Sequence, residues 1–100
     1  MGRLVLAPAV LDDFDRFLDH FERFKIEDGP TRVSAIVEAF QILTHSPLIG
    51  RQLRGGNREL VIGRGSRGYV ALYRYVAASD TVFILAVRSQ LELRYKGLQR

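Results

Sequence analysis

The chain has 100 residues and a mass of 11.4 kDa, the size of one domain with a single core, which excludes a large multidomain enzyme. Hydrophobic residues make up 47% of the sequence and charged residues 26%, a composition that excludes a disordered chain. Cysteine is absent, which excludes disulfides, thiolate metal sites and cysteine nucleophiles. No apolar run reaches the roughly 18 residues that a membrane helix needs, so we expect a cytoplasmic protein with no membrane partner.

Charge is divided unevenly between the two halves of the chain, whose formal net charge is +4. Residues 1–50 contain five basic and eight acidic residues, for a net charge of −3, whereas residues 51–100 contain ten and three, for +7. A basic half of this size can attract an anionic partner, either nucleic acid or an acidic polypeptide. A solvated basic face without a partner explains the charge equally well.

The first half of the sequence has the pattern of one short strand and two helices. Residues 3–6 are strand-like, and Pro8 fits the first turn of a helix. Apolar residues recur every three or four positions from Leu11 to Phe24, which predicts an amphipathic helix over about residues 8–25. We attribute the carboxylates at positions 12, 13 and 15 to the helix dipole, which favours acidic groups near a helix start. A second helix is predicted from Pro30 to about His45, and the short connection predicts an antiparallel hairpin.

The second half of the sequence has the pattern of a sheet. Residues 48–56 are predicted to form a loop, and three strands follow over residues 58–62, 69–76 and 81–88. The last of these strands is apolar on both faces, which predicts a central position, and residues 91–100 form a polar tail with helical tendency. The order β-α-α-β-β-β predicts one α+β domain over residues 1–100, in which a helical hairpin packs on a mostly antiparallel four-stranded sheet.

Residue types offer little support for metal or nucleotide chemistry. The glycine-rich segment 63–68 lacks the Gly-Lys-Ser/Thr of a phosphate loop and precedes a strand, so we interpret it as a hairpin turn. His20 and His45 have no partner at metal-ligand spacing, so we expect no metal and no cofactor.

The remaining feature is a concentration of arginine and tyrosine in the predicted sheet. Such groups can hold phosphates and stack on bases, but they also suit an ordinary strand surface. We expect these side chains to face a macromolecule from the side of the sheet that the helices leave open. The group consists of Arg58, Arg67, Tyr69, Tyr73, Arg74, Tyr75, Arg88, Arg94 and Tyr95.

Five segments in order along nearly the whole chain carry a resemblance to a known family. They are Leu6–Ala9, Ser46–Arg51, Arg58–Gly63, Gly68–Tyr73 and Leu85–Gln90. Together they resemble the RelE/ParE family of bacterial toxins, and the third and fourth are closer to ParE-like and plasmid-stabilisation members. The resemblance implies the growth-inhibiting toxin of a type II toxin–antitoxin pair. Such a toxin is neutralised by a small cognate antitoxin and contacts operator DNA only through it.

The resemblance leaves two activities open, because RelE-like members cut mRNA on the ribosome and ParE-like members poison DNA gyrase. Where the nucleases place their cations, this chain has Glu59, Val61, Val70 and Gln90, and only Tyr95 lies near their C-terminal tyrosine. We therefore expect a toxin that acts by binding, with gyrase as its target.

Two alternatives to a gyrase-binding toxin remain. One is a ribosome-dependent mRNA endonuclease that uses relocated residues, Arg58, Arg74, Arg88 and Tyr95 among them. The other is a family member that binds its antitoxin and harms nothing. The candidate contacts for target or antitoxin are Arg58, Arg67, Tyr69, Tyr73, Arg74, Arg88, Gln90, Arg94 and Tyr95.

Overall fold

The structure is a computed structural model that describes residues 2–93. The first half contains β1 (Arg3–Leu6), α1 (Pro8–Arg23), α2 (Gly29–Phe40) and the short α3 (Ile42–His45). The second half contains β2 (Arg51–Gln52), β3 (Arg58–Ile62), β4 (Tyr69–Val76) and β5 (Thr81–Ser89). Short 3-10 turns η1 (Arg54–Gly56), η2 (Gly65–Arg67) and η3 (Ala77–Ser79) lie between these strands. Residues 90–93 are helical, which agrees with the start of the predicted tail, and residues 94–100 lie outside the described part.

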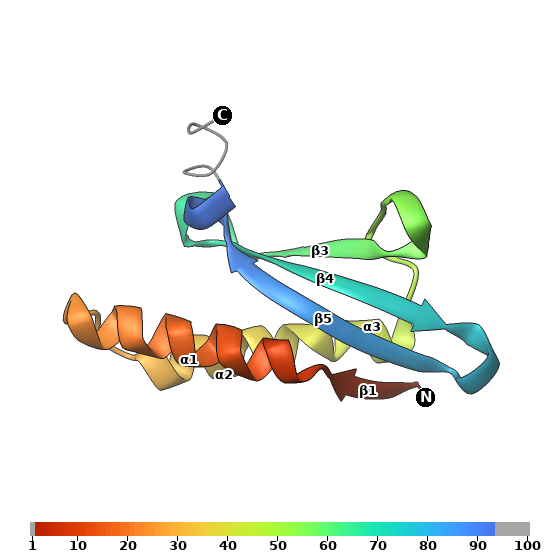
Figure 1. Ribbon diagram of the computed structural model, residues 1–100, viewed down its shortest axis with the longest axis horizontal. Helices are drawn as coiled ribbons and strands as arrows, with labels where there is room; N and C mark the ends of the chain where they lie inside the picture. The colour runs from red at the N-terminus through yellow and green to blue at the C-terminus, as the bar shows by residue number, and fades with distance from the viewer. Residues whose placement is uncertain (1, 94–100) are drawn as a thin grey trace.

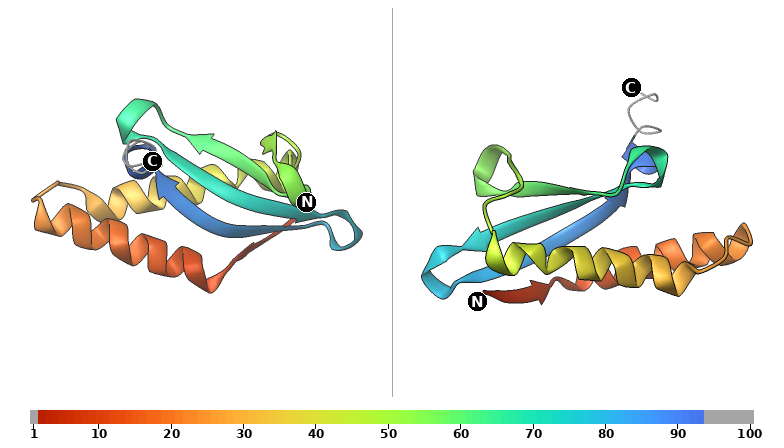
Figure 2. Two further views of the ribbon diagram at one scale, coloured as in Figure 1. Left: turned by 45° about the horizontal axis from the view of Figure 1, so that its top comes forward. Right: turned by 180° about the vertical axis from the view of Figure 1, so that it is seen from behind.

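The five strands form one mixed sheet in the order β1-β5-β4-β3-β2. β1 is parallel to β5, and the other neighbours are antiparallel. Helices α1 and α2 lie side by side against one face of the sheet and leave the other face uncovered (Figures 1 and 2). The predicted α+β class, the helical hairpin and the internal position of β5 are therefore confirmed. Among the described residues, no helix is both long and apolar enough to cross a bilayer.

Two predicted boundaries in the connecting segments are wrong. Residues 51 and 52, assigned from sequence to a loop, pair with Glu59 and Arg58, so the sheet has a fifth strand. The second helix ends at Phe40, and Gln41 separates it from α3. A two-residue strand carries no periodic pattern, which is why sequence reading missed it.

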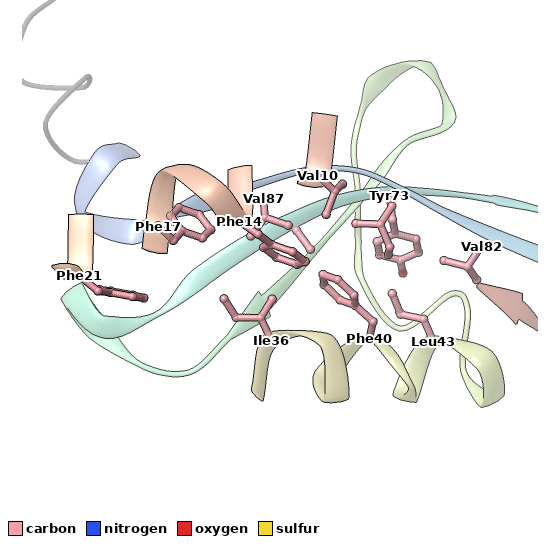
Figure 3. Close-up of a cluster of buried hydrophobic side chains, with 12 residues drawn as sticks. Val10, Phe14, Phe17, Phe21, Ile36, Phe40, Leu43, Tyr73, Val82 and Val87 are labelled. Atoms are coloured by element: carbon pink, nitrogen blue, oxygen red, sulfur yellow. The ribbon is translucent and has the colours of Figure 1, made fainter. Parts of the chain in front are cut away.

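The hydrophobic core lies between the helical hairpin and the sheet (Figure 3). Phe14 of α1 and Phe40 of α2 stack with ring centroids 6.5 Å apart, which joins the two helices. Leu11 and Phe24, which the predicted apolar stripe includes, are exposed instead. The fully or almost fully buried apolar side chains are Val10, Phe14, Phe17, Phe21, Ile36, Phe40, Leu43, Ala71, Tyr73, Val82, Ile84 and Val87.

A bulge in β5 keeps the buried face of this strand continuous. Ile84 pairs with Tyr73 and Ala86 pairs with Leu72, which leaves Leu85 as one extra residue in β5. Side chains alternate across a regular strand, so positions 84 and 87 would point to opposite faces without it. With the bulge, Val82, Ile84 and Val87 are all fully buried.

Tyr73 and Arg58 hold the segment that leads from α3 to β2. The buried Tyr73 hydroxyl donates to the Pro47 carbonyl oxygen at 2.8 Å and accepts the Gly50 N–H at 2.8 Å. The Arg58 guanidinium donates to the Leu48 and Gly50 carbonyl oxygens at 3.1 and 2.9 Å. A side chain at Gly50 would come within 2.6 Å of the Tyr73 hydroxyl, so only glycine fits there. These contacts satisfy backbone groups that belong to no helix or strand.

We predict that Tyr73→Phe lowers the free energy of unfolding by about 1–3 kcal/mol, because it leaves the Gly50 N–H buried without an acceptor. Tyr75→Phe is the matched control, since its hydroxyl makes only an exposed hydrogen bond to Asp80, and we expect a change within about 0.5 kcal/mol. Urea denaturation of both variants measures the difference. Equal stabilities would contradict a role for Tyr73 in holding this segment.

Candidate functional site

Beyond the end of β1, a carboxylate accepts a backbone hydrogen bond from the free edge of β5. β1 pairs only with residues 81–84 of β5, and the Ala7 N–H then donates to the Ile84 carbonyl oxygen at 2.9 Å. Farther along, the Val87 N–H donates to Asp13 Oδ2 at 2.8 Å, from the side of α1. Asp13 is only 4% exposed. It therefore takes the place of a missing strand partner for the buried edge.

Two arginines neutralise Asp13 and connect it to the residues that follow β5. Asp13 Oδ1 accepts from Arg16 Nη1 at 2.7 Å and from Arg88 Nη1 at 2.8 Å. Arg16 also donates to both carboxylate oxygens of Glu92, at 3.2 Å each. Burial alone would lower the pKa of Arg16, but the hydrogen bonds to Asp13 and Glu92 raise it above its ordinary value. The network joins α1, β5 and the helical turn at residues 90–93.

Asp13 corrects the interpretation of the acidic residues in α1. The first turn of the helix, residues 8–11, contains no acidic residue, so the helix dipole does not explain Asp13. Its position was readable in the sequence, because residue 13 lies three residues after Val10 and four before Phe17, both of them buried.

We predict that Asp13→Asn lowers the free energy of unfolding by about 2–3 kcal/mol, because two guanidiniums lose their shared anion and charge-assisted hydrogen bonds are lost. Asp15→Asn, an exposed change on the same helix, is the control and should shift stability by less than about 0.5 kcal/mol. Chemical denaturation near neutral pH measures both. Matching midpoints for the two variants would show that the network contributes nothing.

On the helix side of the sheet lies a cavity of about 730 Å³, which we call the hairpin pocket. Phe17 and Phe21 of α1 and Tyr69 of β4 form its apolar wall, with the Phe17 and Tyr69 ring centroids 5.1 Å apart. Ile26 and Leu91 add apolar groups, and Leu91 is 54% exposed. The remaining lining residues are Arg16, His20, Arg32, Arg67, Ser89 and Glu92.

Two guanidiniums at the hairpin pocket have no carboxylate partner among residues 2–93. Arg32 lies over the Phe21 ring, 5.6 Å from its centroid, and donates only to the Glu27 carbonyl oxygen at 3.3 Å. Arg67 is exposed in the turn between β3 and β4 and makes no side-chain hydrogen bond within the described residues. Arg16, in contrast, is paired with Asp13 and Glu92. The pocket is therefore apolar inside, with available positive charge from α2 and from the β3–β4 turn.

The partly buried position of Tyr69 predicts a measurable pH dependence of the stability. Burial raises the pKa of its hydroxyl, and the nearby Glu92 adds to this, although Arg32 acts in the opposite direction. The unfolded chain therefore loses this proton first as the pH rises past about 10, and stability falls until the folded protein has also lost it. We expect Tyr69→Phe to lose less stability than the unaltered protein over this alkaline range. Urea titrations at a series of alkaline pH values measure the free energy of unfolding of both proteins. If this free energy fell equally with pH in both, the expectation would be contradicted.

The opposite side of the sheet, which we call the open face, is mainly apolar. It carries Val61 of β3, 57% exposed, together with Val70 and Leu72 of β4. A shallow hollow of about 250 Å³ on this face is lined by Glu59, Val70, Leu72, Ala86, Arg88 and Leu93. Arg74 is exposed on this side, with only a 3.5 Å contact to the Gly55 carbonyl oxygen, whereas Arg51 is paired with Glu59.

The expectation that arginines and tyrosines share the open face is wrong for most of them. Tyr69, Tyr73 and Tyr75 pack toward the core, because odd positions of β4 face the helices. Arg58 faces the same side and binds carbonyl oxygens, and the Arg88 guanidinium is tied to Asp13. Gln90 donates its backbone N–H to the Gly68 carbonyl oxygen at 2.9 Å, beside the turn. Arg67 lies at the hairpin pocket and Arg74 on the open face, while Arg94 and Tyr95 lie outside the described residues.

Sequence reasoning also missed several residues at the hairpin pocket. Phe17 and Phe21 were assigned to the core stripe, which is correct, but they also line the cavity. Arg32 and Glu92 carried no sequence signal, because each meets the pocket only through the packing of distant segments. Arg16 could have been inferred from its spacing to Asp13 on one helix face.

The fold is similar to that of chains in solved structures of toxin–antitoxin systems. The chromosomal ParDE system of Pseudomonas aeruginosa aligns with a TM-score of 0.73 and 24% identity over 89% of this chain and 96% of that one. The Escherichia coli RelBE complex aligns with a TM-score of 0.64 and 20% identity over 89% and 96%. The Mycobacterium tuberculosis RelBE2 complex aligns with a TM-score of 0.61 and 25% identity over 89% and 98%. No curated protein matches the sequence.

The sequence gives the family directly, since residues 4–94 match the ParE toxin of the type II toxin–antitoxin system parDE. The chain belongs to this family. It is the toxin of a type II pair, and its partner is a cognate antitoxin. The resemblance inferred from five short segments is therefore confirmed, including its closer relation to the ParE-like branch.

Proposed function

We propose that this toxin acts in the cytoplasm by binding its target without cleaving it, and that the target is DNA gyrase. Growth stops when the toxin is free and resumes when the antitoxin covers it. Gyrase enters the proposal from membership of the ParE branch. Operator DNA is contacted only through the antitoxin.

One observation carries the preference for binding over RNA cleavage, namely the composition of the open face. Cleavage through a 2′-hydroxyl needs a base, an acid and cations around the phosphate. The open face instead presents Glu59, Val61 and Val70 where RelE-like nucleases carry cations. Among residues 2–93 the relocated cations do not converge either, because Arg58 and Arg88 are held by carbonyl oxygens and by Asp13. An mRNA endonuclease is the alternative that the experiment below must exclude.

We predict that induction without the antitoxin inhibits gyrase supercoiling and produces gyrase–DNA cleavage complexes, with no new mRNA 5′ ends in primer extension. Arg74→Glu should weaken gyrase inhibition by about tenfold or more, because it replaces an exposed cation of the open face that has no carboxylate partner among residues 2–93 with an anion. Arg3→Glu, the same change on the edge strand β1, is the control. Normal supercoiling during growth arrest would exclude gyrase, and new 5′ ends would favour the nuclease. Undisturbed growth would indicate an inactive family member.

A further inference from the structure

We propose that the toxin contacts the DNA held by gyrase as well as gyrase itself, through arginines at one end of the open face that bind phosphate groups. These residues are Arg51, Arg54 and Arg74, which we call the arginine cluster. The inference rests on the proposed gyrase function and deepens it, because it gives the target surface a second component. The apolar part of the open face contacts protein, and the arginine cluster contacts the DNA backbone.

The arginine cluster lies where β2, η1 and the second half of β4 meet. Arg74 Nη1 is 3.5 Å from the Gly55 carbonyl oxygen, so the Arg74 guanidinium lies against η1. Arg51 pairs with Glu59 in the adjacent strand, and Arg54 belongs to η1 itself. Figure 1 shows η1, in green, above the sheet on the side away from the helices. The three arginines therefore belong to the same end of one surface.

The cluster carries more positive charge than the residues around it neutralise. Residues 50–58 contain three arginines and no acidic residue. In the described part of the chain, Arg54 and Arg74 have no carboxylate partner, and Arg51 is the one member that is paired. Arg58, on the helix side of the sheet, is bound to carbonyl oxygens instead of a carboxylate. The field at this end of the sheet therefore attracts anions.

The chemistry of η1 favours phosphate groups over an acidic peptide. Gly55 and Gly56 both have positive φ angles, and a Cβ added at Gly55 would meet no atom within 4 Å, so this backbone is open to a large partner. Neither cavity described above includes Arg54 or Arg74 in its lining, so neither would hold the anchoring side chain of a peptide bound at the cluster. Arginine side chains and open backbone are typical contacts of a DNA backbone, and they read no base sequence.

The rest of the open face explains why the phosphate contact accompanies a contact with protein. Val61, Val70 and Leu72 give this face an apolar surface, which suits a protein and not a phosphate backbone. Two unpaired guanidiniums are too few for stable binding to DNA alone, since affinity rises with the number of phosphates neutralised. Once gyrase holds the toxin, the DNA is at a high effective concentration, and the same contacts add to the affinity. The cluster therefore favours the DNA-bound form of gyrase.

The test compares the affinity of the purified toxin for immobilised gyrase with and without saturating duplex DNA, by biolayer interferometry. At about 50 mM salt we expect DNA to tighten binding by about tenfold. Most of this gain should be lost at about 200 mM salt, because two phosphate contacts weaken by about tenfold over this range. Arg54→Glu and Arg74→Glu should each abolish the gain, and Arg54→Glu should leave the affinity for DNA-free gyrase within about threefold.

Two further variants serve as controls. Arg64→Glu makes the same change of charge at an exposed position in the β3–β4 turn, at the opposite end of β3 from η1, and should keep the gain. Arg54→Lys should also keep most of it, since a phosphate contact needs a cation more than a planar fork. Circular dichroism and urea denaturation establish that each variant is folded, which we expect because all the altered side chains are exposed.

The outcomes separate this inference from the proposed function. Gyrase binding that DNA does not tighten, or a gain that Arg54→Glu leaves intact, would overturn the contact with DNA and leave gyrase as the target. An equal loss from Arg54→Glu with and without DNA would overturn it in favour of an acidic segment of protein. Failure of the unaltered toxin to bind gyrase in either condition would overturn the target itself, and the contact with its DNA as well.

Discussion

β1 covers only the first half of β5, and the free part of that strand edge is closed by the carboxylate of Asp13. A buried carboxylate is tolerated only when its charge is compensated, which is why Arg16 and Arg88 both bind it. Arg16 is long enough to reach Glu92 as well, so the same interaction fixes the helical turn after β5. That turn supplies Leu91 and Glu92 to the hairpin pocket. The position of the pocket therefore follows from how one strand edge is satisfied.

Within residues 51–93, the distribution of arginine explains why the second half of the chain, although rich in cations, presents no single basic surface. Arg58 holds the segment before β2, and Arg88 neutralises Asp13, so both are engaged inside the protein. Arg67 and Arg74 remain available but lie at different sites, one at the hairpin pocket and one on the open face. The net charge of a sequence indicates how strongly the chain attracts anions, whereas the fold determines on which surface an anion can bind.

The sequence predicts the helices and the longer strands because their apolar residues repeat with the period of each element. It does not predict which face of β4 is buried, because side chains alternate between the two faces whichever of them packs on the helices. Tyrosine also occurs both in cores and on exposed sheet surfaces. The bulge at Leu85 adds to this uncertainty, because it shifts the alternation within one strand. Asp13 was misread because a carboxylate near a helix start has a common explanation that does not require burial. The pocket could not be derived, since its walls come from segments that only tertiary packing brings together.

The extra residue in β5 also constrains how this chain can change length during evolution. Val82 and Ile84 lie on one side of Leu85 and Val87 on the other, and all three need the same side of the sheet. A deletion of Leu85 would leave one residue between Ile84 and Val87, so a regular strand would still keep both on the buried side. A deletion of Phe83 would instead make Val82 and Ile84 adjacent and turn one of them to the other face. Length changes in this gene should therefore accumulate in the turns between strands, and within β5 the loss of one residue should be tolerated at the bulge, where Leu85 is only partly buried, and not between Val82 and Ile84.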